Sequence, residues 1–215
     1  DAQFLADELD PTTSAISKYI YPEARHTNNG FQNTSLSKGF FDAVVGNPPF
    51  GNQSLYDPDY PELKKFSIHN YFISKSLDQL REGGVGAFVV SRYFMDAVDP
   101  SVREHISQYA DFLGAVRLPE TAFRQNALTD VTTDIVFFQK NTGENKRSKD
   151  WTSTASIVAE DHKNGGTKSA TVNSYFAANP GQIIGKMVYA SGMFHDALNC
   201  VADAPLMDLG HEISK

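Results

Sequence analysis

The sequence predicts an α/β fold with a mostly parallel sheet, because apolar runs typical of buried strands alternate with segments of helical periodicity. Two such runs, over residues 40–45 and 85–91, are the clearest strands. Between them, apolar residues recur at helical spacing over 63–80, and a Gly-Gly pair follows shortly afterwards. A strand, a helix and a second strand in this order form the repeating unit of a parallel sheet.

The other elements can be placed from local signals. Asp10 before Pro11 is a suitable N-cap and first residue for a helix. The apolar residues of 40–45 are continuous, so we expect that strand to be covered on both faces. The remaining elements are expected in this order: a strand within 2–10, a helix from Pro11, a short strand after Pro22, a helix over 100–110, and strands over 111–119 and 134–140.

Composition divides the chain at residue 140. The segment 140–150, "KNTGENKRSKD", is charged and polar and has no large apolar residue, as expected of a linker or exposed loop. We therefore expect a core over 1–140 and a linker with a C-terminal appendage over 141–215. The appendage is predicted to hold one or two short helices interrupted at Pro180, and its pattern assigns it no role.

Composition also limits the function classes. The formal net charge of −7 argues weakly against a dedicated nucleic-acid module, although a basic cleft can lie within an acidic chain. A single cysteine excludes an intramolecular disulfide, and the six histidines lack ligand spacing, so we expect no metal site. No apolar stretch is long enough to cross a bilayer, and the first residues do not resemble a signal peptide. We expect a cytoplasmic protein with no membrane partner.

The segment 42–51, "DAVVGNPPFG", carries the strongest chemical signal. The strand must end at Pro48, because proline has no N–H for the sheet ladder. The Asn47 side-chain oxygen and the Pro48 carbonyl are then two fixed acceptors, which suit an NH₂ group. Phe50 offers a flat face for a planar base or amide, a contact of about 1–3 kcal/mol for a base. Because ligands of open α/β sheets bind beyond the carboxyl ends of strands, these residues predict a clamp for a planar amine.

This segment resembles the Asn-Pro-Pro-aromatic motif of exocyclic-amino methyltransferases, chiefly the N6-adenine DNA methylases. The resemblance implies a Rossmann-like, S-adenosylmethionine-dependent methyltransferase fold whose last strand is antiparallel. It makes Asn47, Pro48 and Phe50 catalytic residues, with Asn47 and Pro48 accepting the two amine protons. Pro49 and Phe50 would contact the substrate base. A base within DNA would have to be flipped out of the duplex to reach them.

Other segments resemble the same family on its cofactor side. "ADELD", residues 6–10, resembles the motif whose acidic residue binds the ribose hydroxyls of S-adenosylmethionine, which assigns that role to Glu8. Phe31 matches an aromatic residue beside the cofactor's adenine. The acidic residue usual before it is Gly30 here, which leaves Asn29 or Gln32 to contact the adenine amine.

Asp42, near the start of the strand that leads to the motif, is also assigned to the cofactor side. The family's first motif, a strand with a glycine-rich turn, would precede residue 2. We therefore expect a chain that lacks this first strand and glycine motif, is truncated at its N-terminus and binds S-adenosylmethionine weakly on its own. The two strand edges left without a partner, near Glu8 and along 40–45, are expected to promote self-association.

The segments over 117–140 and 174–187 are most similar to large phage- or plasmid-borne methylases that also carry helicase-like regions. Restriction-modification and antirestriction are both open as biological roles. Other substrates also stay open, because an RNA base or a protein glutamine amide presents an NH₂ group on a planar system. A catalytically inactive, methylase-like module with a structural or DNA-docking role is the non-enzymatic alternative. Phe50 in place of tyrosine favours DNA by association only.

Overall fold

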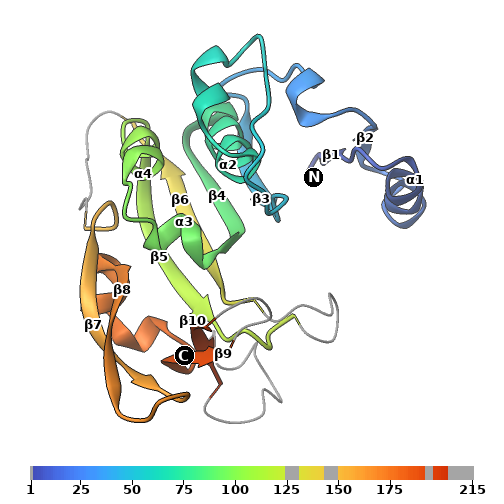
Figure 1. Cartoon of the computed structure of the whole chain (residues 1–215). Helices are drawn as coiled ribbons and strands as arrows, with labels where there is room; N and C mark the ends of the chain where they lie inside the picture. The colour runs from blue at the N-terminus through green and yellow to red at the C-terminus, as the bar shows by residue number, and fades with distance from the viewer. Residues whose placement is uncertain (1, 124–130, 143–149, 192–195, 203–215) are drawn as a thin grey trace.

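The computed structural model of the chain describes residues 2–123, 131–142, 150–191 and 196–202 (Figure 1). Its helices and strands, in chain order, are β1 (Leu5–Asp7), α1 (Pro11–Ile20), β2 (Arg25–Thr27), η1 (Phe31–Asn33), β3 (Phe41–Gly46), η2 (Pro61–Lys65), α2 (Ile68–Gln79), β4 (Leu80–Ser91), α3 (Arg92–Asp96), α4 (Ser101–Ile106), β5 (Ala110–Leu118), β6 (Thr133–Lys140), β7 (Thr154–Asp161), β8 (Thr167–Asn173), α6 (Ser174–Ala178), η3 (Pro180–Gln182), β9 (Lys186–Ser191) and β10 (Asp196–Val201).

The main sheet has four strands in the order β3-β4-β6-β5. β3 and β4 are parallel, and β6 is antiparallel to both β4 and β5. Three strands therefore run in one direction, which confirms the predicted mostly parallel sheet with an antiparallel last strand. That strand, β6, lies between β4 and β5 instead of at an edge (Figure 1).

β1 and β2 form a separate parallel pair, and α1 lies beside them, away from the main sheet (Figure 1). The Asp10 carboxylate accepts a hydrogen bond from the Thr13 backbone N–H at 2.7 Å, so the predicted N-cap of α1 is confirmed. Among the described strands, β1 pairs only with β2, and β3 pairs only with β4. Each of these two strands thus has one edge without a partner in the described part of the chain.

The expectation that β3 is covered on both faces is wrong. Val45 in β3 is 85% exposed, and Phe40 just before it is also exposed. The reason lies in the neighbours of β3, which has a strand at one edge only and contacts one long helix, α2.

The helix predicted over 63–80 is divided into η2 and α2. The division falls at Ser67, whose backbone is extended and whose hydroxyl accepts a hydrogen bond from the Asn70 N–H as the N-cap of α2. α2 then packs on β4 through fully buried side chains, including Leu77. A Cβ on Gly86 of β4 would lie 2.8 Å from a methyl carbon of Leu77, so this close approach requires glycine.

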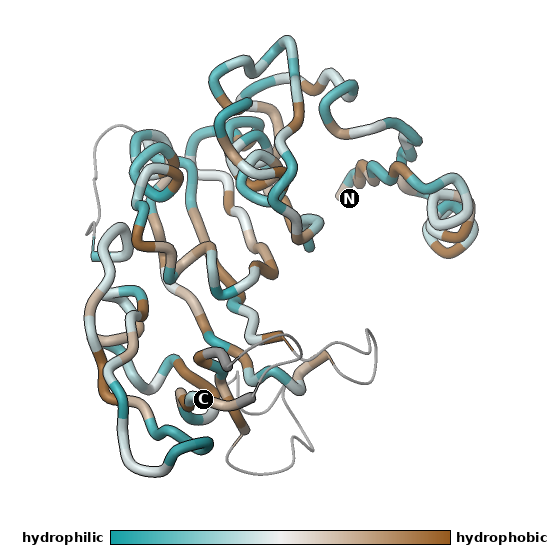
Figure 2. Tube along the Cα trace, viewed as in Figure 1, coloured by the Kyte–Doolittle hydropathy of each residue, from teal (hydrophilic) through white to brown (hydrophobic). Residues whose placement is uncertain are grey.

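A second sheet in the order β10-β9-β7-β8 follows the core. The short helices predicted around Pro180 are present as α6 and η3, whereas the four strands were not expected. Figure 2 shows the hydrophilic tip of the β7–β8 hairpin. The hairpin's other end joins the core, where Trp151 stacks on Phe112 at 5.0 Å between ring centroids. The division of the chain at residue 140 stays a prediction.

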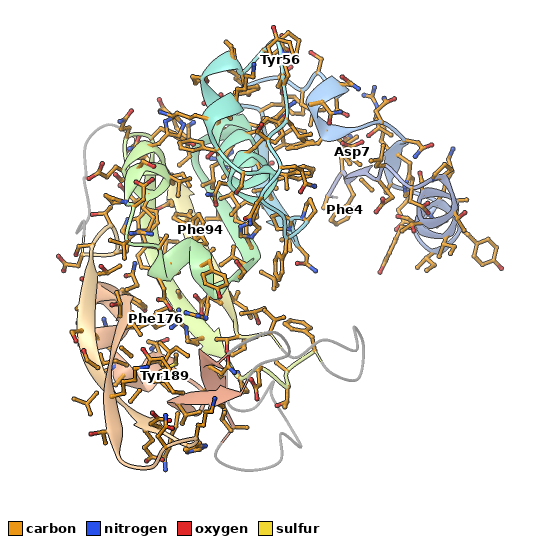
Figure 3. The ribbon with its side chains drawn as sticks, in the orientation of Figure 1. Phe4, Asp7, Tyr56, Phe94, Phe176 and Tyr189 are labelled. Carbon is orange, nitrogen blue, oxygen red and sulfur yellow. The ribbon has the colours of Figure 1, made fainter. Side chains whose placement is uncertain are left out.

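A buried ion cluster also connects the two sheets. The Arg117 guanidinium on β5 donates to both carboxylate oxygens of Asp134 on β6, at 2.8 and 2.9 Å, and to Asp96 of α3 at 2.9 Å. The same Asp96 oxygen accepts a hydrogen bond from the Asn173 backbone at the end of β8, at 2.9 Å. The ring of Phe176 lies 4.3 Å from the guanidinium, where α6 meets β5 (Figure 3).

Arg117 keeps its charge in this cluster. Burial alone would lower the pKa of Arg117, but the carboxylates of Asp134 and Asp96 outweigh that effect and raise it. Removal of Arg117 would therefore leave the buried Asp134 carboxylate without this counter-charge, while Asp96 would keep its longer ion pair with Arg92 at 3.6 Å.

Candidate functional site

The site lies where the strands of the main sheet end. β3 ends at Gly46, directly opposite Phe88 of β4, and a Cβ on this glycine would lie 3.3 Å from the Phe88 ring. Asn47 follows as an exposed residue, and Pro48 after it is buried. The prolines therefore end the strand where the sequence predicts, at the carboxyl edge of the sheet.

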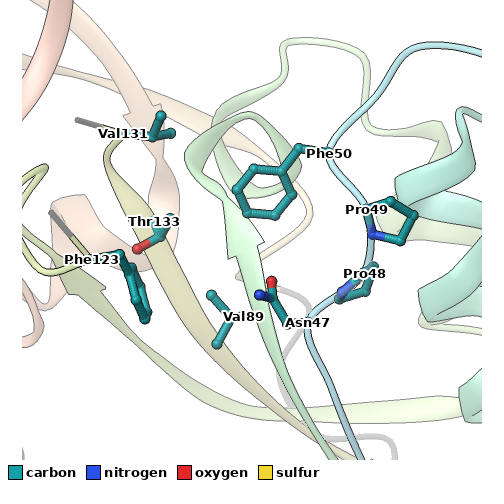
Figure 4. A pocket seen from close by; sticks show the side chains of 8 residues that line it. All are labelled: Asn47, Pro48, Pro49, Phe50, Val89, Phe123, Val131 and Thr133. Atoms are coloured by element: carbon teal, nitrogen blue, oxygen red, sulfur yellow. The ribbon is translucent and has the colours of Figure 1, made fainter. Parts of the chain in front are cut away.

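A hollow of about 340 Å³ opens at this edge (Figure 4). This volume falls within the range of small-molecule sites, roughly 300–1,000 Å³. Its lining combines the segment after β3 with residues of β4, the turn after β5 and the start of β6: Asn47, Pro48, Pro49, Phe50, Val89, Phe123, Val131 and Thr133.

The four residues predicted from the motif are therefore brought together in one hollow. Asn47 supplies a carboxamide, and Pro48 supplies a backbone carbonyl without an N–H of its own. Phe50 is 47% exposed, so its ring has free surface for a planar ligand. The catalytic and substrate roles of these residues stay predictions.

Four lining residues were missed by the sequence analysis. Phe123 lies on another side of the hollow from Phe50 and gives it a second aromatic wall (Figure 4). Val89, Val131 and Thr133 complete the wall from β4 and the start of β6. Phe123 lies in the segment "RLPETAF", and only the pairing of β5 with β6 places it near the motif, so residue spacing alone gives no signal for it.

A second hollow, of about 680 Å³, shares Phe50 and Val131 with the first. Its lining includes His69 in the first turn of α2, whose ring is nearly perpendicular to that of Phe50, with centroids 5.2 Å apart. Burial lowers the pKa of His69 to about 4, so this ring is neutral at pH 7. Among the described residues, its Nε2 atom has no hydrogen-bond partner.

The predicted cofactor residues Glu8 and Phe31 lie on the β1–β2 side of the molecule. Glu8 directly follows β1, and its carboxylate accepts a hydrogen bond from the Asp10 N–H at 2.9 Å. Phe31 begins η1, and its ring packs on Phe72 of α2 with centroids 4.8 Å apart. Figure 3 shows Asp7, the last residue of β1, in the same region. The cofactor roles of Glu8 and Phe31 stay predictions.

The Gln32 side chain fills the space next to Gly30. A Cβ on Gly30 would lie 2.6, 2.7 and 2.9 Å from the three outer atoms of the Gln32 carboxamide. The Gln32 amide thus occupies space that a side chain at position 30 would need. Of the two alternatives from the sequence, Asn29 and Gln32, this geometry favours Gln32.

Asp42 is not brought to the hollow. It lies near the amino end of β3, five residues before Asn47, which is about 17 Å along an extended strand. Its carboxylate accepts a hydrogen bond from Arg81 Nε at 2.6 Å at the exposed surface. The cofactor role assigned to Asp42 stays a prediction.

Two further observations concern other classes of site. Within the ranges that the structure describes, no group of three or more His, Cys, Asp and Glu side chains is placed to hold a metal ion. Within the same ranges, no helix combines the length and apolar character needed to span a membrane.

Comparison with known proteins decides the family. A family model described as Eco57I restriction-modification methylase matches residues 6–118, more than half of the chain. The chain belongs to this methylase family. The match spans β1 to β5 and includes the Asn47–Phe50 segment, and it confirms the predicted resemblance.

A phage protein is also similar to this methylase chain. "Defense against restriction protein B" of Escherichia phage P1 is 29% identical over 143 residues, which cover 65% of this chain. The chain spans only 6% of the length of that protein. The similarity supports the predicted link to restriction-modification and antirestriction proteins.

Solved structures show the fold. A class I S-adenosylmethionine-dependent methyltransferase from Listeria monocytogenes is 20% identical with a TM-score of 0.56, covering 69% of this chain and 48% of that one. A modification subunit assigned to a type I restriction enzyme of Vibrio vulnificus YJ016 is 17% identical with a TM-score of 0.55, covering 63% and 32%. The EcoKI M protein is 20% identical with a TM-score of 0.50, covering 72% and 35%. The methylase chain therefore has the Rossmann-like methyltransferase fold that the sequence predicts.

Proposed function

We propose that this methylase transfers a methyl group from S-adenosylmethionine to the N6 amine of an adenine flipped out of DNA. The observation that carries the proposal is the hollow at the carboxyl edge of the sheet. It combines the Asn47 amide and the Pro48 carbonyl with the aromatic rings of Phe50 and Phe123. A planar base between such rings would present its amine to the two acceptors.

The proposed role of the acceptors is electrostatic. Two hydrogen bonds, from the amine to Asn47 and to Pro48, oppose delocalisation of the nitrogen lone pair into the ring. Positive charge would then develop on the amine nitrogen as it gains the methyl group that the bound cofactor would supply. Fixed acceptors stabilise that charge without reorganising, and one amine proton then leaves to solvent.

The cofactor supplies an electrophilic methyl group when bound. Three residues on the β1–β2 side have groups suited to its adenosine half: the Glu8 carboxylate after β1, and the Phe31 ring and Gln32 amide of η1. In this proposal Glu8 binds the ribose hydroxyls and Gln32 contacts the adenine. A glycine-rich cradle for the methionine half is not among the residues that the structure describes, so we expect weak binding by this chain alone.

The proposal extends to the whole protein. We propose that it acts on DNA in the cytoplasm, with residues 1–140 as the catalytic part. We further propose that helicase-like regions belong to the same protein, as in the methylases that the sequence resembles. Self-association through the open edges of β1 and β3 is proposed for this chain on its own.

A methyl-transfer assay tests the proposal. The whole protein, with S-adenosylmethionine labelled at the methyl group, is offered unmethylated DNA, DNA premethylated at adenine N6, RNA and protein. We expect label in the unmethylated DNA, recovered as N6-methyladenine. Label only in RNA or protein would contradict the DNA assignment, and no label in any substrate would support the inactive alternative.

Asn47→Ala gives the residue-level test. Because the Asn47 side chain is exposed, its loss should leave the melting temperature unchanged while activity falls by about 10²–10³-fold. Asn164→Ala, in the exposed turn between β7 and β8, is the matched control and should keep full activity. An Asn47→Ala protein with near-normal turnover would remove Asn47 from the mechanism.

A further inference from the structure

Lys75 on α2 is a buried cation whose hydrogen bonds reach two distant segments. Its side chain is 2% exposed, and its Nζ atom donates to the Phe31 carbonyl at 2.7 Å, the Thr34 carbonyl at 3.2 Å and the Asp57 carboxylate at 2.8 Å. An ammonium group has three N–H donors, so all three are used. The ammonium also lies 4.7 Å from the centre of the Phe31 ring.

The first segment belongs to the β1–β2 side. Phe31 is the first residue of η1 and Thr34 follows its last, and the Thr34 hydroxyl donates a hydrogen bond to Asp7 of β1 at 3.1 Å. Thr27 of β2 donates to the other oxygen of the Asp7 carboxylate at 2.6 Å. Since β1 and β2 pair with no strand of the main sheet in the described part of the chain, these contacts and the packing of Phe31 on α2 connect them to the core.

The second segment is the loop that follows the Asn47–Phe50 motif. Its Asp57 carboxylate accepts hydrogen bonds from the Tyr71 hydroxyl, from the Asp59 backbone and from Lys75. Burial alone would raise the pKa of Asp57, but the hydrogen bonds from Lys75 and Tyr71 outweigh it and lower the pKa. The loop is thus fixed to α2 by an ionised carboxylate.

We propose that Lys75 is a positioning residue that holds the β1–β2 side and the loop after the motif at a fixed separation. The inference rests on the proposed function only in calling these the cofactor side and the substrate side. Methyl transfer requires the donor and the acceptor atoms to be aligned closely, and a misplacement of about 1 Å can cost about 10²-fold in rate. One ammonium bonded to both segments would provide that alignment.

A paired substitution separates the positioning role of Lys75 from its contribution to the stability of the fold. Lys75→Met alone would leave the Asp57 carboxylate buried without its cation, which should destabilise the fold. The double variant Lys75→Met/Asp57→Leu removes both charges, and such replacements of buried ion pairs are often neutral or stabilising. It also removes the bonds to the Phe31 and Thr34 carbonyls.

Amide hydrogen exchange, read by mass spectrometry on this chain, is the deciding experiment. In the double variant we expect near-normal protection in α2 and β4, and exchange at least about ten-fold faster over residues 28–36 and 51–60. Glu160→Gln in β7 is the control, because the Glu160 carboxylate contacts His162 and that contact involves neither segment. Normal protection over 28–36 in a folded double variant would overturn the proposal.

Thr34→Val is a second variant that adds no buried charge. It removes the hydroxyl bond to Asp7, so exchange should become faster over 5–8 and 25–28 and stay unchanged over 51–60. Unchanged exchange in β1 and β2 would overturn the link through Thr34. Neither exchange experiment needs cofactor or DNA, so their failure would leave the proposed function standing.

A kinetic measurement on the whole protein gives the functional readout. If Lys75 aligns the donor and acceptor atoms, the double variant should lower kcat by up to about 10²-fold and change the KM for S-adenosylmethionine less. Equal kinetic constants in the double variant and the wild type would overturn the positioning role.

Discussion

The rings of His69 and Phe50 are nearly perpendicular, with ring planes 89° apart and centroids at 5.2 Å. This contact supports the aromatic wall of the proposed base site from behind. It also joins a buried neutral imidazole to a half-exposed ring, so the two residues can be tested separately.

Phe50 is predicted to stack on the target base. Phe50→Ala should weaken binding of DNA that carries a flipped adenine by about 1–3 kcal/mol without a change in melting temperature, because its ring is half exposed. Tryptophan at position 50 should restore binding, and leucine should not. Fluorescence of 2-aminopurine placed at the target base measures the stacking, and equal rescue by leucine would show that Phe50 acts by packing alone.

Because His69 is buried as a neutral ring, we expect the stability of the fold to decrease at acid pH. Its folded pKa of about 4 lies below the ordinary value of 6.5, so the unfolded state binds more protons between these values. The contribution of the neutral His69 ring to the free energy of unfolding is fully present above pH 6.5. It falls by about 2–3 kcal/mol as the pH drops towards 4. Urea unfolding of His69→Phe between pH 7 and pH 4 should show a smaller loss than the wild type. Parallel losses in the two proteins would contradict the buried neutral imidazole.

Gln32 is predicted to contact the cofactor's adenine in place of the acidic residue that is usual at position 30. Gln32→Ala should weaken S-adenosylmethionine binding by the whole protein, as measured by calorimetry. The variant Gly30→Asp/Gln32→Ala should restore it, since removal of the Gln32 amide frees the space that a side chain at position 30 needs. Wild-type affinity in Gln32→Ala would exclude this residue from the cofactor site.

The open edge of β3 predicts self-association of this chain. Val45 is largely exposed on a strand that pairs at one edge, so a second chain can add to it. Val45→Lys should lower the average mass measured by light scattering. Val85→Lys is the control, because Val85 is 45% exposed on β4 and pairs with Ala43 of β3 on one side and Gln139 of β6 on the other. A wild-type chain that stays monomeric at all concentrations would contradict the prediction.

The sequence predicted the main sheet well because its signals are local. Continuous apolar runs mark β3 and β4, helical spacing marks α2, and the prolines after Asn47 mark the end of β3. The Asn47–Phe50 segment is contiguous, so its residues could be assigned to one site before any contact was known.

The parts of the fold and of the hollow that the sequence did not predict depend on contacts between distant segments. In the strands β7 to β10, part of the burial is carried by small residues such as Ala159 and Ala170, which give weak periodicity. Charged residues such as Arg117 and Asp134 usually lie at the surface, and here only tertiary pairing buries them. Phe123 enters the hollow for the same reason, through the pairing of β5 and β6.

The position of β6 has a consequence for biosynthesis. β6 is the last strand of the main sheet to be synthesised, yet it lies between β4 and β5. Until residue 140 has left the ribosome, β4 and β5 have no shared partner, and both present unpaired edges to other nascent chains. The sheet closes only when β6 enters between them and brings Asp134 to Arg117. Completion of the main sheet is therefore late in synthesis, and the hollow, which Val131 and Thr133 line at the start of β6, forms in the same step.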